Sequence, residues 1–249
     1  MPRTDARRNG AQADAAVAAQ LALANRILVK HGILDAFGHV SARSAEQPER
    51  FLLSRNRAPG LVAQDDIQMF DFDGRTADGR PEYLERFIHA EIYRSRPEVM
   101  AVIHSHSPAV TTWSVINKPL EPVIHVAAFL GRGVARYEIR DDRGDSTDLL
   151  IRDSAAGADV ARELGDAPLL LMRGHGFVTV ASSLPLVVYQ AIYAALNAEM
   201  LLRIGHLGRP IVLSAGEARA AEEATAGQVD RAWEVWGSEV QDAGFAVTR

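Results

Sequence analysis

The chain has 249 residues, of which 47% are hydrophobic and 24% charged, a composition typical of a globular protein that buries a sizeable core. The formal net charge is −5 and like charges form no block, so nucleic acid is not expected as the main partner. Cysteine is absent, which excludes a disulfide framework, a thiolate nucleophile and a cysteine zinc site; any zinc-like site must use histidines and carboxylates.

No apolar run in the sequence approaches the roughly 18 residues that a bilayer-spanning helix needs. The N-terminal segment contains arginines but no apolar core before a cleavage site, so it does not resemble a signal peptide. We therefore expect a cytoplasmic protein without a membrane partner. Residues 1–249 are expected to form one domain with a frayed N-terminal end of about 10 residues, because the sequence shows no repeat, linker or break in composition.

Hydrophobic periodicity and turn residues predict interspersed helices and strands. The first helix is expected over 12–31, where Val17, Leu21 and Leu28 recur at helical spacing and Gly32 is a stop signal. Further helices are predicted at 81–97, 154–164, 184–205 and 216–241. Strands are predicted at 37–43, 51–54, 67–75, 99–106, 134–140, 168–172 and 177–181, with a hairpin signal at Asp73-Gly74. This order predicts one α/β domain with helices flanking a sheet, and the hairpins argue against a purely parallel sheet.

The strand predicted at 99–106 carries two histidines, His104 and His106, one residue apart. Positions i and i+2 of a strand point to the same face, so the two imidazoles lie side by side and suit a shared cation. The alternative is that both side chains cap the end of the strand and bond to backbone. The pair alone does not decide between these two interpretations.

His175 lies between two glycines in the turn that joins the strands predicted at 168–172 and 177–181. Glycines allow a tight turn, and both flanking strands read as buried, so the imidazole is expected to project from a firmly held base. The alternative is a turn histidine in solvent. Three neutral imidazoles around an open position make a typical catalytic metal site.

Glu85 lies 19 residues before His104, in the helix predicted at 81–97. A helix that folds back on the following strand would bring this carboxylate over the strand's end, although a glutamate on a helix is most often solvated. His89, one turn later, either orients Glu85 or packs against it. The helix is expected to face inward with Leu84, Phe87, Ile88 and Ile92.

Glu85, the "HSHS" segment, the "HG" turn and "GHVSAR" occur in an order that resembles the class II aldolase/adducin family over 21–205. The resemblance implies that His104, His106 and His175 bind a divalent metal ion. It implies that Glu85 is the catalytic acid/base and can also coordinate the resting metal. It further implies a three-layer α/β/α sandwich with a central mixed, mainly antiparallel sheet, and a homotetramer with active sites at subunit interfaces.

This sequence lacks the phosphate-binding groups of the family's fuculose-phosphate aldolase-like members. The serine pair before the catalytic glutamate corresponds to Tyr83 and Leu84, which offer no such hydroxyls. The family's Gly-Asn turn near the phosphate corresponds to Gly38-His39. These differences argue against a phosphorylated sugar as substrate.

A threonine-glycine phosphate loop of those aldolases is replaced by "LSRNRAPG", and a tyrosine of theirs is absent where His125 is followed by valine. Together with "YLERFIHAEIYR" and "HVAAFLG", this loop looks more like the decarboxylase branch of the family, which includes 3-hydroxy-2-methylpyridine-4,5-dicarboxylate decarboxylase and dihydroxyphthalate decarboxylase. A guanidinium can grip a carboxylate with two parallel hydrogen bonds, although Arg55 and Arg57 could instead lie in a solvated loop. The predicted substrate contacts are Ser54, Arg55, Gly38, His39 and His125, the last of which could also be a core histidine.

The first functional hypothesis is a divalent-metal lyase that decarboxylates a hydroxylated aromatic, heteroaromatic or related hydroxy-oxo carboxylic acid. One cation per subunit, Zn²⁺ or Mn²⁺, would act as a Lewis acid that holds developing negative charge. Glu85 would protonate the carbon, which requires a pKa raised by burial. The alternative is an aldolase or dehydratase on a small hydroxy-carbonyl substrate of the sugar-phosphate kind. A non-enzymatic scaffold of the adducin type is disfavoured, because a scaffold has no need of the complete set of histidines and Glu85.

Overall fold

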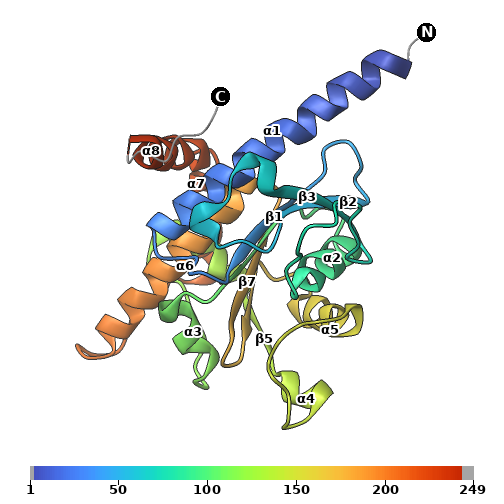
Figure 1. Ribbon diagram of the computed structural model, residues 1–249. Coiled ribbons are helices and arrows are strands. Elements are labelled where there is room, and N and C mark those ends of the chain that lie inside the picture. Colours follow the sequence, from blue (N-terminus) through green and yellow to red (C-terminus); the bar gives the residue numbers. More distant parts are fainter. Residues whose placement is uncertain (1–2, 243–249) are drawn as a thin grey trace.

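Short strands rich in β-branched and aliphatic residues form one seven-stranded sheet in the structure, a computed structural model that describes residues 3–242. The strand order is β3-β2-β1-β4-β7-β6-β5 (Figure 1). All neighbours pair antiparallel except β5 and β6, which are parallel. The strands are β1 (His39–Arg43), β2 (Arg50–Ser54), β3 (Ile67–Asp71), β4 (Ala101–Ser105), β5 (Val134–Tyr137), β6 (Leu169–Met172) and β7 (Gly176–Ala181).

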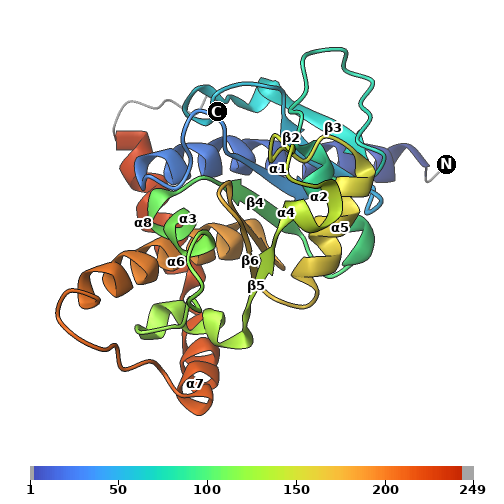
Figure 2. The same cartoon turned by 90° about the horizontal axis from the view of Figure 1, so that it is seen from below.

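Helices cover both faces of this sheet. In both views α6 lies on the opposite side of the sheet from α2 and α5 (Figures 1 and 2). The helices are α1 (Arg3–Lys30), α2 (Arg86–Ser95), α3 (Pro108–Ser114), α4 (Ile139–Arg143), α5 (Ser154–Leu164), α6 (Leu184–Ile204), α7 (Ala215–Ala226) and α8 (Val229–Asp242), with 3₁₀ turns η1 (Pro59–Leu61), η2 (Gln64–Asp66) and η3 (His125–Arg132). The expected three-layer α/β/α sandwich with a mixed, mainly antiparallel sheet is confirmed.

Alternation along β4 divides the buried side chains between two cores. Ala101 and Ile103 pack into the core that includes residues of α1, α3 and α6, whereas Val102 packs into the core with α2 and α5. Because successive strand residues point to opposite faces, His104 shares the face of Val102, toward α2. The strand is buried along its whole length, so its end is held rigidly.

Several predicted boundaries differ from the structure. The first helix begins at Arg3, and so includes much of the segment that we expected to be frayed. The strand predicted at 67–75 ends at Asp71, because Gly74 (φ +74°) reverses the chain into a loop and β3 is an edge strand with no further partner. The strand predicted at 134–140 ends at Tyr137, before α4. The helix predicted at 216–241 divides at Gly227, because α7 packs on η3 whereas α8 packs on α1 and α6.

The helix predicted at 81–97 begins only at Arg86, so Glu85 is its N-cap residue and does not lie within it. The Glu85 side chain makes no capping bond, because its carboxylate is turned away from the helix and accepts from the Ile151 amide. The expectation that Leu84 faces inward is wrong, since 54% of this residue is exposed. Ile88 and Ile92 are fully buried as predicted.

Helix α6 alone among the described helices is long and apolar enough to cross a bilayer by length and composition. This corrects the expectation that no segment would qualify. The larger part of its most apolar stretch is buried against the rest of the chain, as in a core helix.

Candidate metal centre

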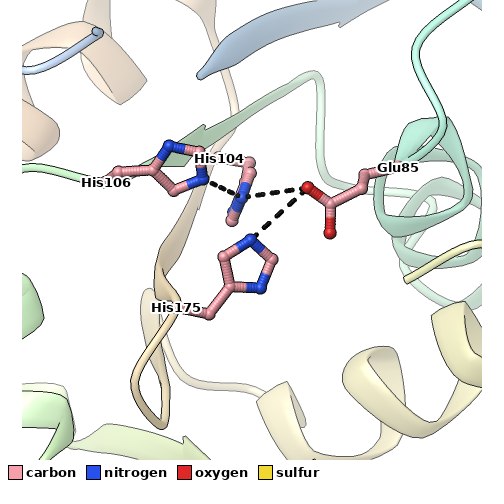
Figure 3. A group of neighbouring side chains, drawn as sticks. All are labelled: Glu85, His104, His106 and His175. Carbon is pink, nitrogen blue, oxygen red and sulfur yellow. Dashed lines mark hydrogen bonds and ion pairs between the residues drawn. The ribbon is translucent and has the colours of Figure 1, made fainter. Parts of the chain in front are cut away.

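Three segments that are distant in sequence bring four metal-binding side chains together at one end of the sheet. His104 is the penultimate residue of β4 and His106 follows that strand directly, His175 lies in the β6–β7 turn, and Glu85 precedes α2 (Figure 3). One ligand atom from each of the four lies within 4.8 Å of all the others. The predicted metal ligands are therefore brought together as a set.

Glycines on both sides of His175 explain how the β6–β7 turn reaches the centre. Gly174 has φ +67°, a conformation that other residues rarely adopt. A Cβ atom on Gly176 would lie 2.2 Å from the Ser105 carbonyl oxygen, so the turn can approach β4 only with glycine here. The histidine is thereby held against the end of the strand that carries the other two.

The nearest atoms of the cluster are electron-pair donors that face one another. His104 Nε2 lies 3.0 Å from His106 Nε2 and 3.6 Å from a Glu85 oxygen, and His175 Nε2 lies 3.4 Å from the same oxygen (Figure 3). His104 is fully buried, and burial lowers its pKa well below the usual value, so its imidazole is neutral. Lone pairs that converge in this way suit a shared cation.

Asp35 holds the third imidazole in the orientation that a ligand needs. His106 Nδ1 lies 3.2 Å from an Asp35 oxygen, which leaves Nε2 free to face the cluster. The amides of Phe37 and Gly38 donate to Asp35 Oδ1 at 2.8 and 2.9 Å. Burial raises the pKa of Asp35, but these amides and His106 outweigh it and lower the pKa. A carboxylate–histidine pair of this kind orients many metal-binding histidines.

The expected raised pKa of Glu85 is wrong. Burial does raise it, but a hydrogen bond from His175, electrostatic interactions with the His104 and His175 imidazoles, and the Ile151 amide lower the pKa to about 2. The Ile151 N–H donates to Glu85 Oε1 at 3.0 Å, which fixes one oxygen and leaves Oε2 facing the histidines. Glu85 is therefore an ionised carboxylate at neutral pH, ready to bind a cation or to accept a proton.

Glu85, His106 and His175 of the cluster line a cavity of about 580 Å³. Most of its wall is apolar, and none of the described residues that line it is a lysine or arginine. The wall residues are Phe37, His39, Asn56, Tyr83, Leu84, Asp148, Leu149, Leu150 and Gly174. A cavity of this size accommodates a small-molecule substrate with one aromatic ring.

Of the five predicted substrate contacts, only His39 lines this cavity. Gly38 is buried beside it. Ser54 is buried and its Oγ lies 3.3 Å from the Tyr83 hydroxyl, one layer behind the wall. His125 is exposed at the start of η3.

The Arg55 guanidinium does not reach the cavity, because it pairs with buried Asp66. Arg55 Nε lies 2.6 Å and Arg57 Nη1 2.8 Å from the two Asp66 oxygens, and the Ala63 amide also donates to Asp66. Burial raises the pKa of Asp66, but the Ala63 amide and both arginines outweigh it and lower the pKa. Asp66 therefore engages both guanidinium groups of this loop.

Sequence reasoning missed two polar residues of the site. Asp35 could have been found, because Asp-x-x-Gly at 35–38 is a turn signature directly before His39. Asn56 lines the cavity between the two arginines that turn away from it, and no pattern in the loop distinguishes it.

The donor set fits a divalent cation. Three imidazole nitrogens and one ionised carboxylate oxygen are ligands that Zn²⁺ and Mn²⁺ both accept. The far nitrogens, His104 Nδ1 and His175 Nδ1, are buried without a hydrogen-bond partner, so their hydrogens are placed away from the centre when Nε2 is the ligand. These residues can hold a divalent metal ion.

Comparisons with known proteins agree with this geometry. Residues 19–202 match the family model for the class II aldolase and adducin N-terminal domain. The chain is 36% identical over 245 residues to the decarboxylase tropJ of Talaromyces stipitatus, which covers 88% of this chain and 92% of that one. It is 31% identical over 201 residues to the 3,4-dihydroxyphthalate decarboxylase of Arthrobacter keyseri, covering 76% and 78%. An aldolase II superfamily protein from Pseudomonas syringae shares the fold, with a TM-score of 0.79 at 20% identity, over 94% of this chain and 96% of that one.

Proposed function

Because the chain belongs to the class II aldolase and adducin family, we propose that it is a divalent-metal-dependent decarboxylase. The proposed substrate is a hydroxylated aromatic, heteroaromatic or related hydroxy-oxo carboxylic acid. Relatives that are decarboxylases and relatives that are aldolases support a lyase of this family. The choice of decarboxylation rests on the cavity as well as on the relatives.

The cavity wall is the observation that carries this choice. Phe37, Tyr83, Leu84, Leu149 and Leu150 present apolar or aromatic surface above the ligand cluster. A planar ring buries well against such a wall, whereas a phosphorylated sugar needs several hydrogen-bond partners and a cation for its phosphate. The described wall offers a sugar phosphate little of either.

A bound Zn²⁺ or Mn²⁺ would supply Lewis acidity and so stabilise negative charge that develops on substrate oxygen. His104, His106, His175 and Glu85 would hold it, with Asp35 orienting His106. The apolar wall would exclude water and keep the ring in one plane beside the ligand cluster.

Glu85 would move the proton. Because its pKa is low, Glu85 is ionised in the resting protein, so it would first accept the proton of the substrate hydroxyl next to the leaving carboxylate. When the carbon–carbon bond breaks, carbon dioxide leaves and the electron pair stays on the ring. Glu85 then returns its proton to that carbon, and a proton from water restores the hydroxyl group. The residue therefore acts as base before it acts as acid.

An aldolase or dehydratase is the alternative, because the same ligand cluster and the same proton carrier serve both reactions. An L-fuculose phosphate aldolase of Methanocaldococcus jannaschii is 34% identical, but only over 89 residues. We propose further that the protein is a cytoplasmic homotetramer of one domain per chain, with active sites at subunit interfaces. The exposed Phe37 and Leu84 at the cavity support a covering subunit.

The test is a product assay with the manganese-loaded and the zinc-loaded protein. Carbon dioxide release is measured over a panel of ortho-hydroxy aromatic carboxylates, and retro-aldol cleavage over a panel of sugar phosphates. Release of carbon dioxide from at least one aromatic acid, without cleavage of the sugar phosphates, is the expected result. Cleavage of a sugar phosphate without decarboxylation would establish the alternative.

A further inference from the structure

A buried chain of hydrogen bonds runs from the cavity wall into the core between β1 and α2. His39 Nδ1 lies 2.6 Å from His89 Nε2, and His89 Nδ1 lies 2.6 Å from Ser41 Oγ. Ser41 Oγ lies 2.8 Å from the Tyr93 hydroxyl. None of the four residues is more than 1% exposed. The metal-ligand set does not include any of them.

The arrangement follows from the periods of the two elements. His39 and Ser41 are two residues apart on β1 and so share one face of the strand. His89 and Tyr93 are four residues apart on α2 and so share one face of the helix. The two pairs interleave where that helix packs on the sheet, and each side chain meets its partners from the other element.

Burial lowers the pKa of His89 to about 3, against an opposing effect of the Glu85 charge, so His89 is neutral and has one N–H and one lone pair. His39 Nδ1 and His89 Nε2 lie 2.6 Å apart, so one of these two nitrogens donates and the other accepts. Each bond in the chain therefore needs one donor and one acceptor, and its direction is a question of where every hydrogen goes.

The Tyr93 hydroxyl shows which direction the chain runs. The only acceptor that the described residues offer its hydroxyl hydrogen is Ser41 Oγ, and the Val102 amide supplies a hydrogen bond to the phenolic oxygen. Ser41 must then donate its own hydrogen to His89 Nδ1, and His89 Nε2–H must donate to His39 Nδ1. The opposite direction would leave the Tyr93 hydrogen buried without an acceptor, which is costly.

The consequence is a hydrogen-bond donor on the cavity wall. With Nδ1 occupied as an acceptor, the His39 hydrogen resides on Nε2, which makes no hydrogen bond to any described residue. A neutral donor binds an anionic oxygen without placing a further positive charge beside a divalent cation. An arginine at this position would add that charge.

We propose that His39 is a substrate-binding residue whose Nε2–H donates to an anionic oxygen of the substrate, and that His89 and Ser41 are positioning residues that hold it in this tautomer. The substrate part of this proposal rests on the proposed function, because it needs a carboxylate or a developing oxyanion in the cavity. The tautomer part does not.

The test uses the full-length, zinc-loaded protein labelled with ¹⁵N in its histidines. Long-range ¹H–¹⁵N correlations report which ring nitrogen carries the hydrogen. His39 and His89 are both expected as the single Nε2–H tautomer. A hydrogen on His39 Nδ1 would overturn the proposal, whether or not the protein decarboxylates anything.

Two variants distinguish the effect of the hydrogen-bond chain on the tautomers from an effect of altered packing. Ser41→Ala removes the group that donates to His89 Nδ1, so a mixture of tautomers is expected at His89 and His39. Tyr93→Phe is the matched control, because the Ser41 hydrogen then has His89 Nδ1 as its only acceptor and the tautomer should persist. An unchanged spectrum in Ser41→Ala would show that the hydrogen-bond chain does not set the tautomer.

A binding measurement tests the substrate part with salicylate as the probe. The His39 Nε2 proton is expected to move downfield on titration, and His39→Phe should weaken salicylate binding about tenfold or more, because a hydrogen bond to a charged group is lost. His39→Gln, which keeps a donor at a similar reach, should recover part of the affinity. Equal affinity in wild type and His39→Phe would overturn the assignment of His39, while a failed product assay with normal salicylate binding would count against the proposed function alone.

Discussion

Two groups of histidines lie side by side at the end of the sheet, and they differ in how their ring nitrogens are used. His39 and His89 belong to a chain in which both ring nitrogens of His89 and the Nδ1 of His39 make hydrogen bonds to other side chains. His104 and His175 keep Nδ1 without a hydrogen-bond partner and direct Nε2 toward other electron-pair donors. Ring centroids of His39 and His104 are only 5.2 Å apart, so burial and location do not separate the groups. Their hydrogen-bond partners do separate them, because only the second group directs Nε2 toward other potential metal ligands.

The largest effect is expected from a substitution at Glu85 that abolishes proton transfer but preserves the arrangement of the metal ligands. Glu85→Gln keeps an oxygen beside the histidines but cannot accept and return a proton, so decarboxylation should fall by about 100-fold or more while most of the metal is retained. Turnover and metal content are measured on the same preparation. Glu98→Gln, an exposed substitution, is the matched control. Full activity in Glu85→Gln would remove this residue from its role.

A smaller effect is expected from a change at Asp35, the carboxylate that orients His106. Asp35→Asn weakens the orientation of His106, so the affinity for Zn²⁺ should fall by about 10- to 100-fold, as for other carboxylate partners of metal-binding histidines. Competition with a chelator measures it. An affinity equal to that of the wild type would mean that Asp35 does not orient the ligand.

His89, in the hydrogen-bonded chain, should affect how the free energy of unfolding depends on pH. The pKa of His89 is about 3 in the folded state and ordinary when unfolded, so below pH 6.5 the unfolded chain binds a proton that the folded chain excludes. The free energy of unfolding therefore falls as the pH decreases from 6.5 toward 3. Between pH 6.5 and 5 this residue contributes a loss of about 1.5 kcal/mol.

His89→Gln lacks this contribution. The metal-free variant should show a shallower pH dependence than the metal-free wild type in chemical denaturation between pH 6.5 and 5. Parallel curves for the two proteins would show that His89 is not held neutral by burial.

The smallest effect concerns the loop that faces away from the cavity. Arg55→Lys loses a hydrogen bond to Asp66 and should cost about 1 kcal/mol of stability, with KM changed less than about threefold. Steady-state kinetics at saturating metal check it. A large rise in KM at unchanged metal content would show that Arg55 binds substrate, as the sequence predicted.

The sequence predicts the ligands better than the substrate contacts, for a physical reason. His104 and His106 are set by strand alternation and His175 by its flanking glycines, which are local constraints that a sequence displays. Arg55 could be expected near the site, but the structure pairs it with Asp66, eleven residues later, because a 3₁₀ turn returns that carboxylate to the loop. A guanidinium in a sequence does not show which of several carboxylates it will meet.

Local sequence patterns predict the type of most elements but not the order of the strands in the sheet. The β-branched and aliphatic segments at 168–172 and 177–181 predict β6 and β7, but their pairing with β4 and β5 depends on contacts between distant segments. The sequence predicted a raised pKa for Glu85, whereas its pKa is lowered. Burial of Glu85 could be expected from the sequence, but its contacts with the neighbouring imidazoles and the Ile151 amide could not.

Metal analysis of the purified protein tests the central claim most directly. We expect about one divalent ion per chain in wild type and in Ser41→Ala, and a small fraction of that in His104→Ala and His175→Ala, because only the latter two remove ligands. Equal metal content in all four proteins, or no bound divalent ion in the wild type after incubation with Zn²⁺ or Mn²⁺, would contradict the account.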